Sequence, residues 1–496
     1  MKKLTSLLIA LAMLLSFASF AAEEEPYVIT AMLPDFYTDT EFVKDGNPVL
    51  EAITAATGVK LEITWVANSV YPDQTSLTLA DPDNMPMIMV LQSVDVDNAR
   101  AGAFWDLTDY IDDFDNLAAG AAAVYNNISV DGRIYGIYRA RNVVRNGPYY
   151  RSDIAKAVGY ENEPATLEEF TKLCYDMLAY IKANYGDNAY LLNCCEYIAG
   201  TIEIITVMHG APYLYGVDEE GVLYPSFEAP EYLEGLTWLR DLYAAGGIDP
   251  EFMTIASGNW NDAERNNTAF MRFDCLDNGY RQQEWFETNQ GVTEQIFALL
   301  ASVTNDNGDF CVKPTSGYNG QVVITKAVKT EEDFLKCLGF LDWCNSAEGQ
   351  TLVNWGVEGE TYWIWDDGYR YTTPVDGTDM TSYVTAVQHS LNQIGMNVNG
   401  DLTPPAATTP LRSEFAAMQG DPYLLANLVA DPTVPLQASN EAYTKYNATL
   451  ATKLEDAAVQ YIAGIIDEDA LFEVWDAWYV EGGQEIVDGF NALYNK

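Results

Sequence analysis

The sequence predicts an α/β protein with a doubly wound sheet and a helical C-terminus. At its start, strands and helices are expected to alternate in the order β-α-β-α-β, which is typical of a parallel sheet. Residues 87–91 form a continuous apolar run, which favours a strand buried on both faces. From about residue 442 onward the pattern is mostly helical. Hydrophobic residues make up 48% of the chain, which excludes a disordered protein.

The first five elements have recognisable boundaries. They are expected, in order, as a strand at 27–33, a helix at 48–57, a strand at 59–65, a helix at 71–80 and a strand at 87–91. Asn47 is a good N-cap, Pro48 suits the first helical turn, and Gly58 suits the helix end. Apolar and polar residues alternate through 59–65, as they do in a half-buried strand.

The later elements follow from turn and cap signals. They are a hairpin around Asp131-Gly132, a helix that begins after Thr166, a helix at 231–245, a strand at 321–325 and a helix from Thr330 to about 345. Asp-Gly between short apolar runs is typical of a hairpin turn. Thr166 and Glu169 form a capping box, and an apolar stripe runs along the helix behind them.

The charge balance excludes several function classes. Lysine and arginine total 26 and aspartate and glutamate total 73, so the formal net charge is −47. A surface this negative repels nucleic acid and anionic lipid, so no nucleic-acid partner is expected. The chain has two histidines, which argues against a His-rich metal site. A length of 496 residues suggests two domains or more.

The N-terminus has the pattern of a secretory signal. Lys2 and Lys3 precede a short apolar stretch, and small residues near Ala21 suit a signal peptidase, so residues 1–21 are expected to be a signal peptide. The protein is then expected to be periplasmic or secreted. The first of seven cysteines is Cys174, so no lipobox cysteine is expected near the cleavage point. Mostly free, buried thiols are favoured over a disulfide framework. The count is odd, the adjacent Cys194 and Cys195 cannot bridge without strain, and Cys337 and Cys344 are too far apart on one helix face.

Motifs for nucleotide binding and for common catalytic centres are absent from the sequence. It contains no dinucleotide fingerprint, no P-loop, no H-E-x-x-H, no G-x-S-x-G and no EF-hand pattern. No cofactor and no metal site is therefore expected. Carboxylates are so numerous that a pair of the kind used by glycosidases remains open as an alternative.

Five stretches carry a family resemblance. They are Val130-Asp-Gly-Arg-Ile-Tyr-Gly-Ile137, Arg145-Asn-Gly-Pro-Tyr-Tyr-Arg-Ser-Asp153, the helix start at 164–170, Gly247-Ile-Asp-Pro-Glu-Phe252 and Trp355-Gly-Val-Glu-Gly-Glu-Thr-Tyr362. Each motif is weak alone, but the five in this order are fairly specific. The chain resembles the family 1 extracellular solute-binding proteins of ABC importers, particularly their long oligosaccharide-binding branch.

The resemblance implies a two-lobe periplasmic-binding-protein fold, with hinge strands between lobes that close on a ligand. The expected N-terminal lobe is 27–142 plus about 320–385, and the expected C-terminal lobe is 143–319 plus about 386–496. Some relatives carry a calcium loop after the helix that starts near Thr166. Here residues 185–190 are too short and too poor in ligands, so no calcium is expected. The implied partners are a small-molecule ligand and the ABC permease subunits, and the protein is expected to be a monomer.

A sugar site needs flat aromatic rings for the C–H faces of the ligand, and polar side chains for its hydroxyls. Trp260, beside Asn259 in a loop, is the preferred candidate for such a platform. The alternative is a tryptophan packed on its own lobe. Trp355, Glu358 and Tyr362 lie in the last family-like stretch and are further candidates, with a purely structural turn as their alternative.

Two polar residues follow expected strands. Asp35 comes just after the first strand and Gln92 after the third. The carboxyl ends of the strands form the ligand crevice of a doubly wound sheet, so both are candidate ligand-binding residues. The alternatives are a helix or turn cap for Asp35 and an ordinary loop-end residue for Gln92.

The arginines are unevenly distributed. Five of the twelve are Arg133, Arg139, Arg141, Arg145 and Arg151. Arg139 and Arg141 are expected near the lobe crossing, where their guanidinium groups could bind the hydroxyls or carboxylates of a ligand. The alternative is a set of hinge arginines paired with acidic neighbours. If the first interpretation holds, an acidic sugar becomes a possible ligand despite the overall charge.

The expected function is an extracytoplasmic receptor, not an enzyme, that captures an oligosaccharide and delivers it to an ABC importer. One alternative is a secreted carbohydrate-active enzyme that uses paired carboxylates. Another is a ligand-sensing or surface-structural protein on the same fold. Because one fold serves many solutes, the class of ligand rests on the resemblance.

Overall fold

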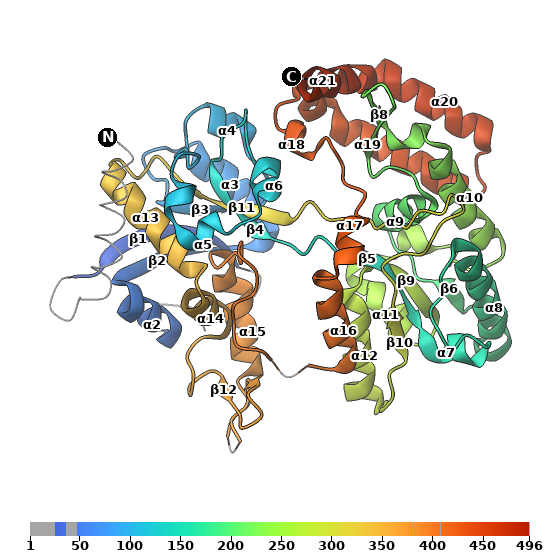
Figure 1. Cartoon of the computed structure of the whole chain (residues 1–496), viewed down its shortest axis with the longest axis horizontal. Helices are drawn as coiled ribbons and strands as arrows, with labels where there is room; N and C mark the ends of the chain where they lie inside the picture. The colour runs from blue at the N-terminus through green and yellow to red at the C-terminus, as the bar shows by residue number, and fades with distance from the viewer. Residues whose placement is uncertain (1–24, 36–46, 376, 407, 496) are drawn as a thin grey trace. The chain divides into compact units, whose positions relative to one another are not determined.

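The computed structural model describes residues 25–35, 47–375, 377–406 and 408–495, with the backbone alone for 386–390. The expected signal peptide lies outside the described residues. The chain divides into two compact units. Unit 1 comprises Met1–Arg141 and Ser316–Ala407, and unit 2 comprises Asn142–Thr315 and Thr408–Lys496 (Figure 1).

Unit 1 is built on a five-stranded mixed sheet. Its strands are β1 (Tyr27–Asp35), β2 (Val59–Ala67), β3 (Ile88–Leu91), β4 (Gly136–Ala140) and β11 (Tyr318–Ile324). Their order is β2-β1-β3-β11-β4, with β2 and β3 parallel to β1 and with β11 antiparallel to both neighbours. The expected β-α-β-α-β order is thus confirmed, with α2 and α3 as the crossing helices.

The remaining elements of unit 1 are mostly short. Its helices are α2 (Pro48–Thr57), α3 (Tyr71–Leu79), α4 (Val96–Arg100), α5 (Asp115–Ala118), α6 (Ala122–Asn127), α13 (Glu331–Cys344), α14 (Ala347–Trp355) and α15 (Thr381–Ser390). Short 3₁₀ turns are η2 (Asn68–Val70), η3 (Ile111–Asp113) and η7 (Leu391–Gln393), and a small hairpin pairs β12 (Trp363–Ile364) with β13 (Arg370–Tyr371).

Local signals explain the boundaries of these elements. The Asn47 side chain accepts a hydrogen bond from the N–H of Val49, and Gly58 ends α2 in the left-handed region with φ of 69°. At the expected hairpin turn, Asp131 and Gly132 both have positive φ, and Val130 pairs with Arg133. The run that follows does not extend a hairpin: it becomes β4 and pairs with β11.

Unit 2 is built on a four-stranded sheet in the order β10-β5-β9-β6. Its strands are β5 (Asn146–Arg151), β6 (Tyr190–Leu192), β9 (Ala269–Cys275) and β10 (Phe297–Leu299), and a separate hairpin pairs β7 (Tyr215–Val217) with β8 (Leu223–Pro225). β5 runs antiparallel to β9 and β10, and β6 runs parallel to β9.

Helices make up most of unit 2. They are α7 (Ser152–Ala157), α8 (Leu167–Tyr185), α9 (Ala199–His209), α10 (Pro230–Ala244), α11 (Trp260–Arg265), α12 (Asp277–Gln290), α16 (Pro410–Gln419), α17 (Pro422–Ala426), α18 (Val434–Gln437), α19 (Glu441–Ile462), α20 (Glu468–Trp478) and α21 (Gln484–Tyr494), with turns η4 (Ser226–Glu228), η5 (Phe252–Thr254), η6 (Ser257–Asn259) and η8 (Tyr479–Gly483). The expected helical C-terminus is confirmed. The Thr166 side chain caps α8, and the apolar stripe of α8 is buried in the main core of the unit.

The last crossing from unit 1 to unit 2 comes after Ala407, later than the expected position near 385. The segment 386–406 stays with unit 1 because backbone carbonyls within it accept hydrogen bonds from β4. The N–H of Ala140 donates to the carbonyl of Met396, and the Tyr138 hydroxyl donates to the carbonyl of Val398 over 2.9 Å. These contacts join residues far apart in the sequence, so no local motif predicts them.

Two further features of the structure concern membrane-spanning helices and disulfides. Among the residues that the structure describes, no helix is both long enough and apolar enough to span a bilayer. All seven cysteines are free, five of them buried and two half-buried. Burial raises the pKa of the Cys275 thiol to about 11, which keeps it protonated at neutral pH.

Candidate functional site

The sheet of unit 1 reverses its strand order at β1. The chain goes from β1 outward to β2 on one side and then to β3 on the other, so a topological switch point lies between β1 and β3. β4 is parallel to β3, and β11 runs the other way. The carboxyl ends of β1, β2, β3 and β4 and the start of β11 therefore share one edge, which we name the switch edge.

The switch edge brings together the polar residues expected from strand ends. Asp35 is the last residue of β1, and Gln92 follows β3. The Gln92 side chain donates a hydrogen bond of 2.8 Å to the Asn68 side chain, which follows β2. Both amides are exposed at this edge, so they remain open to a ligand on their outer side.

Arg139 near the end of β4 adds a positive charge to the switch edge. Its guanidinium donates to the backbone carbonyl of Asn319 over 3.0 Å, and within the described residues it has no ion-pair partner. Burial and the neighbouring charge of Arg141 lower the pKa of Arg139 to about 10. The side chain therefore stays charged at neutral pH, and a carboxylate or hydroxyl could bind it.

The other arginines of this stretch are held by acids. Arg133 pairs with Asp106 and Asp109, Arg145 with Asp277, and Arg151 with Asp153. The paired-arginine alternative therefore describes these three side chains. Arg141 is exposed, its backbone N–H donates to Gly317, and it is the last residue of unit 1 before the first crossing.

The stretch from Trp355 to Tyr362 closes on itself. The Thr361 hydroxyl donates to the carbonyl of Trp355, and the N–H of Gly359 donates to the carbonyl of Tyr362. The Arg370 guanidinium carbon lies 3.4 Å from the centroid of the Trp355 ring, and Tyr362 is buried. The contacts of this stretch therefore fit the alternative in which it is a purely structural turn.

Within the same turn, Glu358 is exposed and pairs in an isolated bridge with Tyr362. Burial and the negative charge of Glu358 raise the pKa of the Tyr362 hydroxyl. Glu358 is thus the member of this group that solvent reaches most readily, and Tyr362 is part of the packing.

Trp260 lies in unit 2 at the start of α11 and is 7% exposed. Its indole N–H donates to the carbonyl of Asn193 over 3.2 Å, and the Arg272 guanidinium carbon lies 4.3 Å from its ring centroid. This is the position of a tryptophan packed on its own lobe, the alternative that the sequence left open. Asn259, one residue earlier, is exposed.

A buried ion pair explains why this tryptophan is enclosed. Arg272 and Glu264 are each 2% exposed, and their nearest side-chain atoms are 2.6 Å apart. Glu264 also accepts hydrogen bonds from the Tyr149 hydroxyl and the Asn193 amide. Since buried charges need such partners, this network fixes α11 against β9.

Unit 2 also contains a pocket of about 230 Å³ rich in tyrosine, which we name the tyrosine pocket. Its aromatic lining is Tyr213, Tyr215, Phe227, Tyr232, Tyr443 and Trp478, and its polar lining includes Glu203, Gln437, Asn447 and Glu455. The volume is below the roughly 300 Å³ at which pockets for drug-sized ligands begin, so it suits a group about the size of one ring.

One carboxylate of the tyrosine pocket, that of Glu203, forms an ion pair with a lysine. The Lys313 ammonium lies 2.9 Å from a carboxylate oxygen of Glu203 and 5.1 Å from the centroid of the Tyr213 ring. Burial and the charge of Glu203 raise the pKa of nearby Asp431 to about 6. Rings, carboxylates and amides in one hollow are the groups that bind a polyhydroxylated ligand.

Sequence inspection missed the tyrosine pocket because its lining comes from two distant segments, 199–232 and 437–478. The only local signal was the density of tyrosines. In the part of the chain that the structure describes, no group of three or more His, Cys, Asp and Glu side chains is placed to hold a metal ion. The loop at 185–190 is a short turn between α8 and β6.

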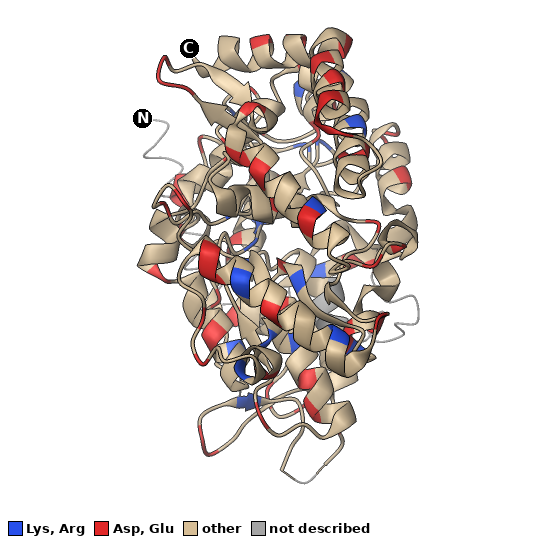
Figure 2. Cartoon of the chain, turned by 90° about the vertical axis from the view of Figure 1, so that its right-hand side faces the viewer, with Lys and Arg blue, Asp and Glu red and all other residues tan. Residues whose placement is uncertain are grey.

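Acidic side chains are spread widely over the helices of unit 2. Figure 2 shows red Asp and Glu residues along many helices, and the blue Lys and Arg residues are fewer. The chain carries 73 acidic against 26 basic residues, so an unpaired arginine such as Arg139 is a local exception. An anionic ligand would therefore be attracted at the switch edge and not by the general surface.

Comparison with known proteins gives one relative at 30% identity. No family model matches the chain. The lipoprotein LipO of Bacillus subtilis (strain 168) is 30% identical over 469 residues, which span 92% of this chain and 90% of LipO. The polygalacturonan/rhamnogalacturonan-binding protein YtcQ of the same organism is 23% identical over 459 residues, 90% of this chain and 88% of YtcQ.

A solved structure shares the fold across nearly the whole chain. The extracellular solute-binding protein from Bifidobacterium longum subsp. infantis aligns with a TM-score of 0.70 and 15% identity, over 96% of this chain and 99% of that one. The expected two-lobe α/β fold with a helical C-terminus is therefore confirmed.

Proposed function

The chain belongs to the family 1 extracellular solute-binding proteins of ABC importers, and from this membership we propose that it is an extracytoplasmic receptor for an oligosaccharide. It captures the ligand and delivers it to the permease subunits of an importer. The similarity to YtcQ, whose name gives polygalacturonan and rhamnogalacturonan as ligands, supports a carbohydrate. The proposal includes the closing of two lobes on the ligand that the resemblance implies.

We take units 1 and 2 as the two lobes. The proposed crossings are at 141/142, 315/316 and 407/408. The protein is proposed to act as a monomer outside the cytoplasm after cleavage of the expected signal peptide. Small-angle X-ray scattering with and without ligand tests lobe closure, since closure should shrink the radius of gyration.

The observation that carries the proposal is the composition of the switch edge. Gln92 and Asn68 present amides at the carboxyl ends of their strands, and Arg139 lies at the same edge without an acidic partner among the described residues. Asp35 and Arg141 are proposed as further ligand groups because their backbones lie at this edge. Amides and a charged fork are suited to hydroxyls and carboxylates of a sugar.

The unpaired arginine favours an acidic sugar. Polygalacturonan is a polymer of uronic acid, and a uronate carboxylate is a natural partner for a guanidinium. We therefore propose an oligosaccharide that contains uronate. The tyrosine pocket is proposed as a second contact, where rings could cover the C–H faces of one sugar residue.

Calorimetric titration with a short oligogalacturonate tests the ligand class. Arg139→Gln should weaken binding about 10- to 150-fold, the equivalent of one charge-assisted hydrogen bond. Arg100→Gln is the matched control, because Arg100 is an exposed arginine of the same unit that is bonded to Asp131. It should change the affinity less than about threefold.

Two outcomes would contradict the proposal. If Arg139→Gln binds the oligogalacturonate as tightly as the unaltered protein, the switch edge does not hold the ligand. If a neutral oligosaccharide of the same length binds equally well and binding does not depend on salt, the ligand is not acidic. Release of shorter sugars from a labelled oligosaccharide would favour the alternative, a carbohydrate-active enzyme.

A further inference from the structure

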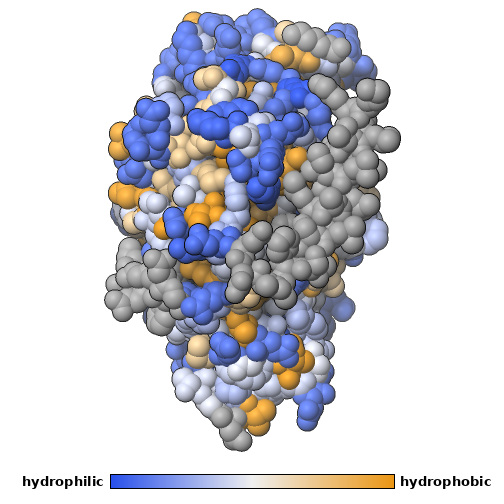
Figure 3. All heavy atoms as spheres, turned by 90° about the vertical axis from the view of Figure 1, so that its left-hand side faces the viewer, coloured by the Kyte–Doolittle hydropathy of each residue, from blue (hydrophilic) through white to orange (hydrophobic). Residues whose placement is uncertain are grey.

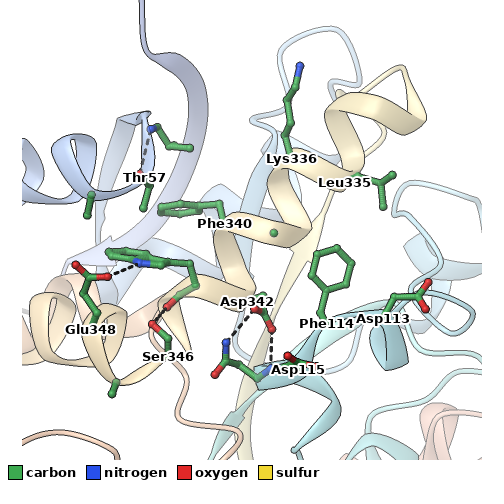
Figure 4. A pocket seen from close by; sticks show the side chains of 16 residues that line it. Thr57, Asp113, Phe114, Asp115, Leu335, Lys336, Phe340, Asp342, Ser346 and Glu348 are labelled. Atoms are coloured by element: carbon green, nitrogen blue, oxygen red, sulfur yellow. Dashed lines mark hydrogen bonds between the residues drawn. The ribbon is translucent and has the colours of Figure 1, made fainter. Parts of the chain in front are cut away.

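Unit 1 contains a second pocket, of about 470 Å³, that the proposed receptor function does not use (Figure 4). One side is formed by the end of α2 and by Val59, the first residue of β2. The switch edge follows the last residue of β2, so the two sites lie at opposite ends of that strand. The volume lies within the roughly 300–1,000 Å³ of small-molecule sites. We name it the α13 pocket.

The walls of the α13 pocket are aromatic. Phe340 and Trp343 of α13 stack with ring centroids 6.1 Å apart and planes 24° apart. Phe114 comes from the segment before α5, and Figure 4 shows its ring across the pocket from Phe340. Leu335 adds an aliphatic side chain to the lining. Aromatic and apolar groups arranged in this way can enclose an apolar body.

Gly339 lines the pocket next to Phe114, and we call its position the floor. It lies in the interior of α13, where glycine destabilises a helix by roughly 1 kcal/mol relative to alanine. Neither crowding nor backbone strain requires it. A Cβ atom there would meet only Phe114 Cε1, at an ordinary 3.6 Å, and the residue has no positive φ. The effect of having glycine at this position is that no side chain fills the pocket.

The rim of the α13 pocket is acidic. Asp113, Asp115 and Glu348 line it, and Glu348 accepts a hydrogen bond of 3.2 Å from the indole N–H of Trp343. Within the described residues, none of these three carboxylates has an ion-pair partner. The rim therefore has a net negative charge.

One lysine also lines the pocket, but its charge is neutralised. The Lys336 ammonium lies 2.9 Å from Glu332 and 3.8 Å from Asp333, and it lies over the ring of Tyr27. Figure 4 shows this side chain extending away from the aromatic walls. An anionic ligand thus gains little from it.

We propose that the α13 pocket binds an organic ammonium ion that has an aromatic or alkyl body. The body would pack over Gly339 between Phe114 and the stacked pair of α13. The ammonium group would lie at the rim beside the carboxylates. Attraction between the cation and both the carboxylates and the ring faces gives the site its preference. The face of unit 1 in Figure 3 is mostly hydrophilic with small apolar patches, so such an enclosed apolar hollow differs from its surroundings.

The probe is 2-phenylethylammonium, with 2-phenylethanol and 3-phenylpropionate as neutral and anionic analogues. Saturation-transfer NMR and calorimetry with the full chain measure their affinities. We expect the ammonium to bind about tenfold more tightly than the carboxylate, since several exposed carboxylates each add a modest attraction. No saturable binding of the ammonium, or equal affinity for all three probes, overturns the proposal.

Gly339→Leu locates the site. Leucine would fill the floor and is a better helix former than glycine, so ammonium binding should be lost while the melting temperature stays equal or rises. Unchanged binding in this variant overturns the proposal. Asp113→Asn with Asp115→Asn should reduce the affinity for the ammonium at least threefold and leave that for 2-phenylethanol unchanged. Oligogalacturonate binding should not change in either variant, which separates this test from that of the receptor function.

Discussion

Replacing Trp260 with alanine separates a packed tryptophan from a ligand platform. The ring is 7% exposed, its N–H is bonded to Asn193, and Arg272 covers one face. Removing a buried tryptophan ring costs about 3–5 kcal/mol, and the lost cation–π contact is part of that sum. Glu264 stays beside Arg272, so no charge is left unpaired. We expect a loss of about 4 kcal/mol in the free energy of unfolding of unit 2.

Calorimetry and urea titration measure this loss. For a unit of this size, 1 kcal/mol corresponds to a shift of about 2–4 °C, so the melting temperature of unit 2 should fall by roughly 8–16 °C. Trp363→Ala is the control, because that ring is half-buried on a small hairpin of unit 1. It should cost under about 2 kcal/mol. If Trp260→Ala instead keeps its stability and loses ligand affinity, the packed placement of this side chain is wrong.

Glu264→Gln should lower the free energy of unfolding by about 3–5 kcal/mol, because Arg272 would stay buried without its counter-charge. Lys60→Gln, at an exposed ion pair, is the control and should cost under about 1 kcal/mol. Equally small losses for both variants in urea titration would contradict this prediction. Burial raises the pKa of Asp431 to about 6, so the folded protein holds this proton more tightly than the unfolded chain does. The free energy of unfolding should therefore fall by up to ~3 kcal/mol as pH rises from about 4 to 6. Burial lowers the pKa of His209 to about 4, so stability from this group should instead grow between about pH 4 and 6.5. Without Asp431, in Asp431→Asn, the melting temperature should rise more steeply with pH. Without His209, in His209→Gln, it should instead fall with pH. An unchanged slope in both variants would show that these two groups do not set the pH dependence.

Local chemistry made much of unit 1 predictable. Asn47 before Pro48 predicted the start of α2, and Gly58 predicted its end. The rule that ligands bind at the carboxyl ends of strands made Gln92 and Asp35 candidates, and both lie at the switch edge, as the rule places them. These inferences depend on residues a few positions apart, which is the range over which sequence patterns act.

Long-range packing made the rest unpredictable. The burial of Trp260 depends on Asn193 and Arg272, which are 67 and 12 positions away. The tyrosine pocket draws on segments more than two hundred residues apart. The retention of residues 386–406 in unit 1 depends on hydrogen bonds from Tyr138 and Ala140. Tertiary contacts of this kind leave no periodicity or spacing in the chain.

The position of β11 in the sheet sets the order in which the protein can assemble. β11 lies between β3 and β4, and it is the only strand that joins β4 to the rest of the sheet in the described chain. It is synthesised about 180 residues after β4, roughly 10–35 s later at ribosomal speed. The first 140 residues therefore cannot complete the sheet of unit 1 on their own, and all of β5 to β10 must be synthesised before β11. This delay suits the signal peptide expected from the sequence, because an export machinery that carries unfolded polypeptides needs a chain that has not yet folded.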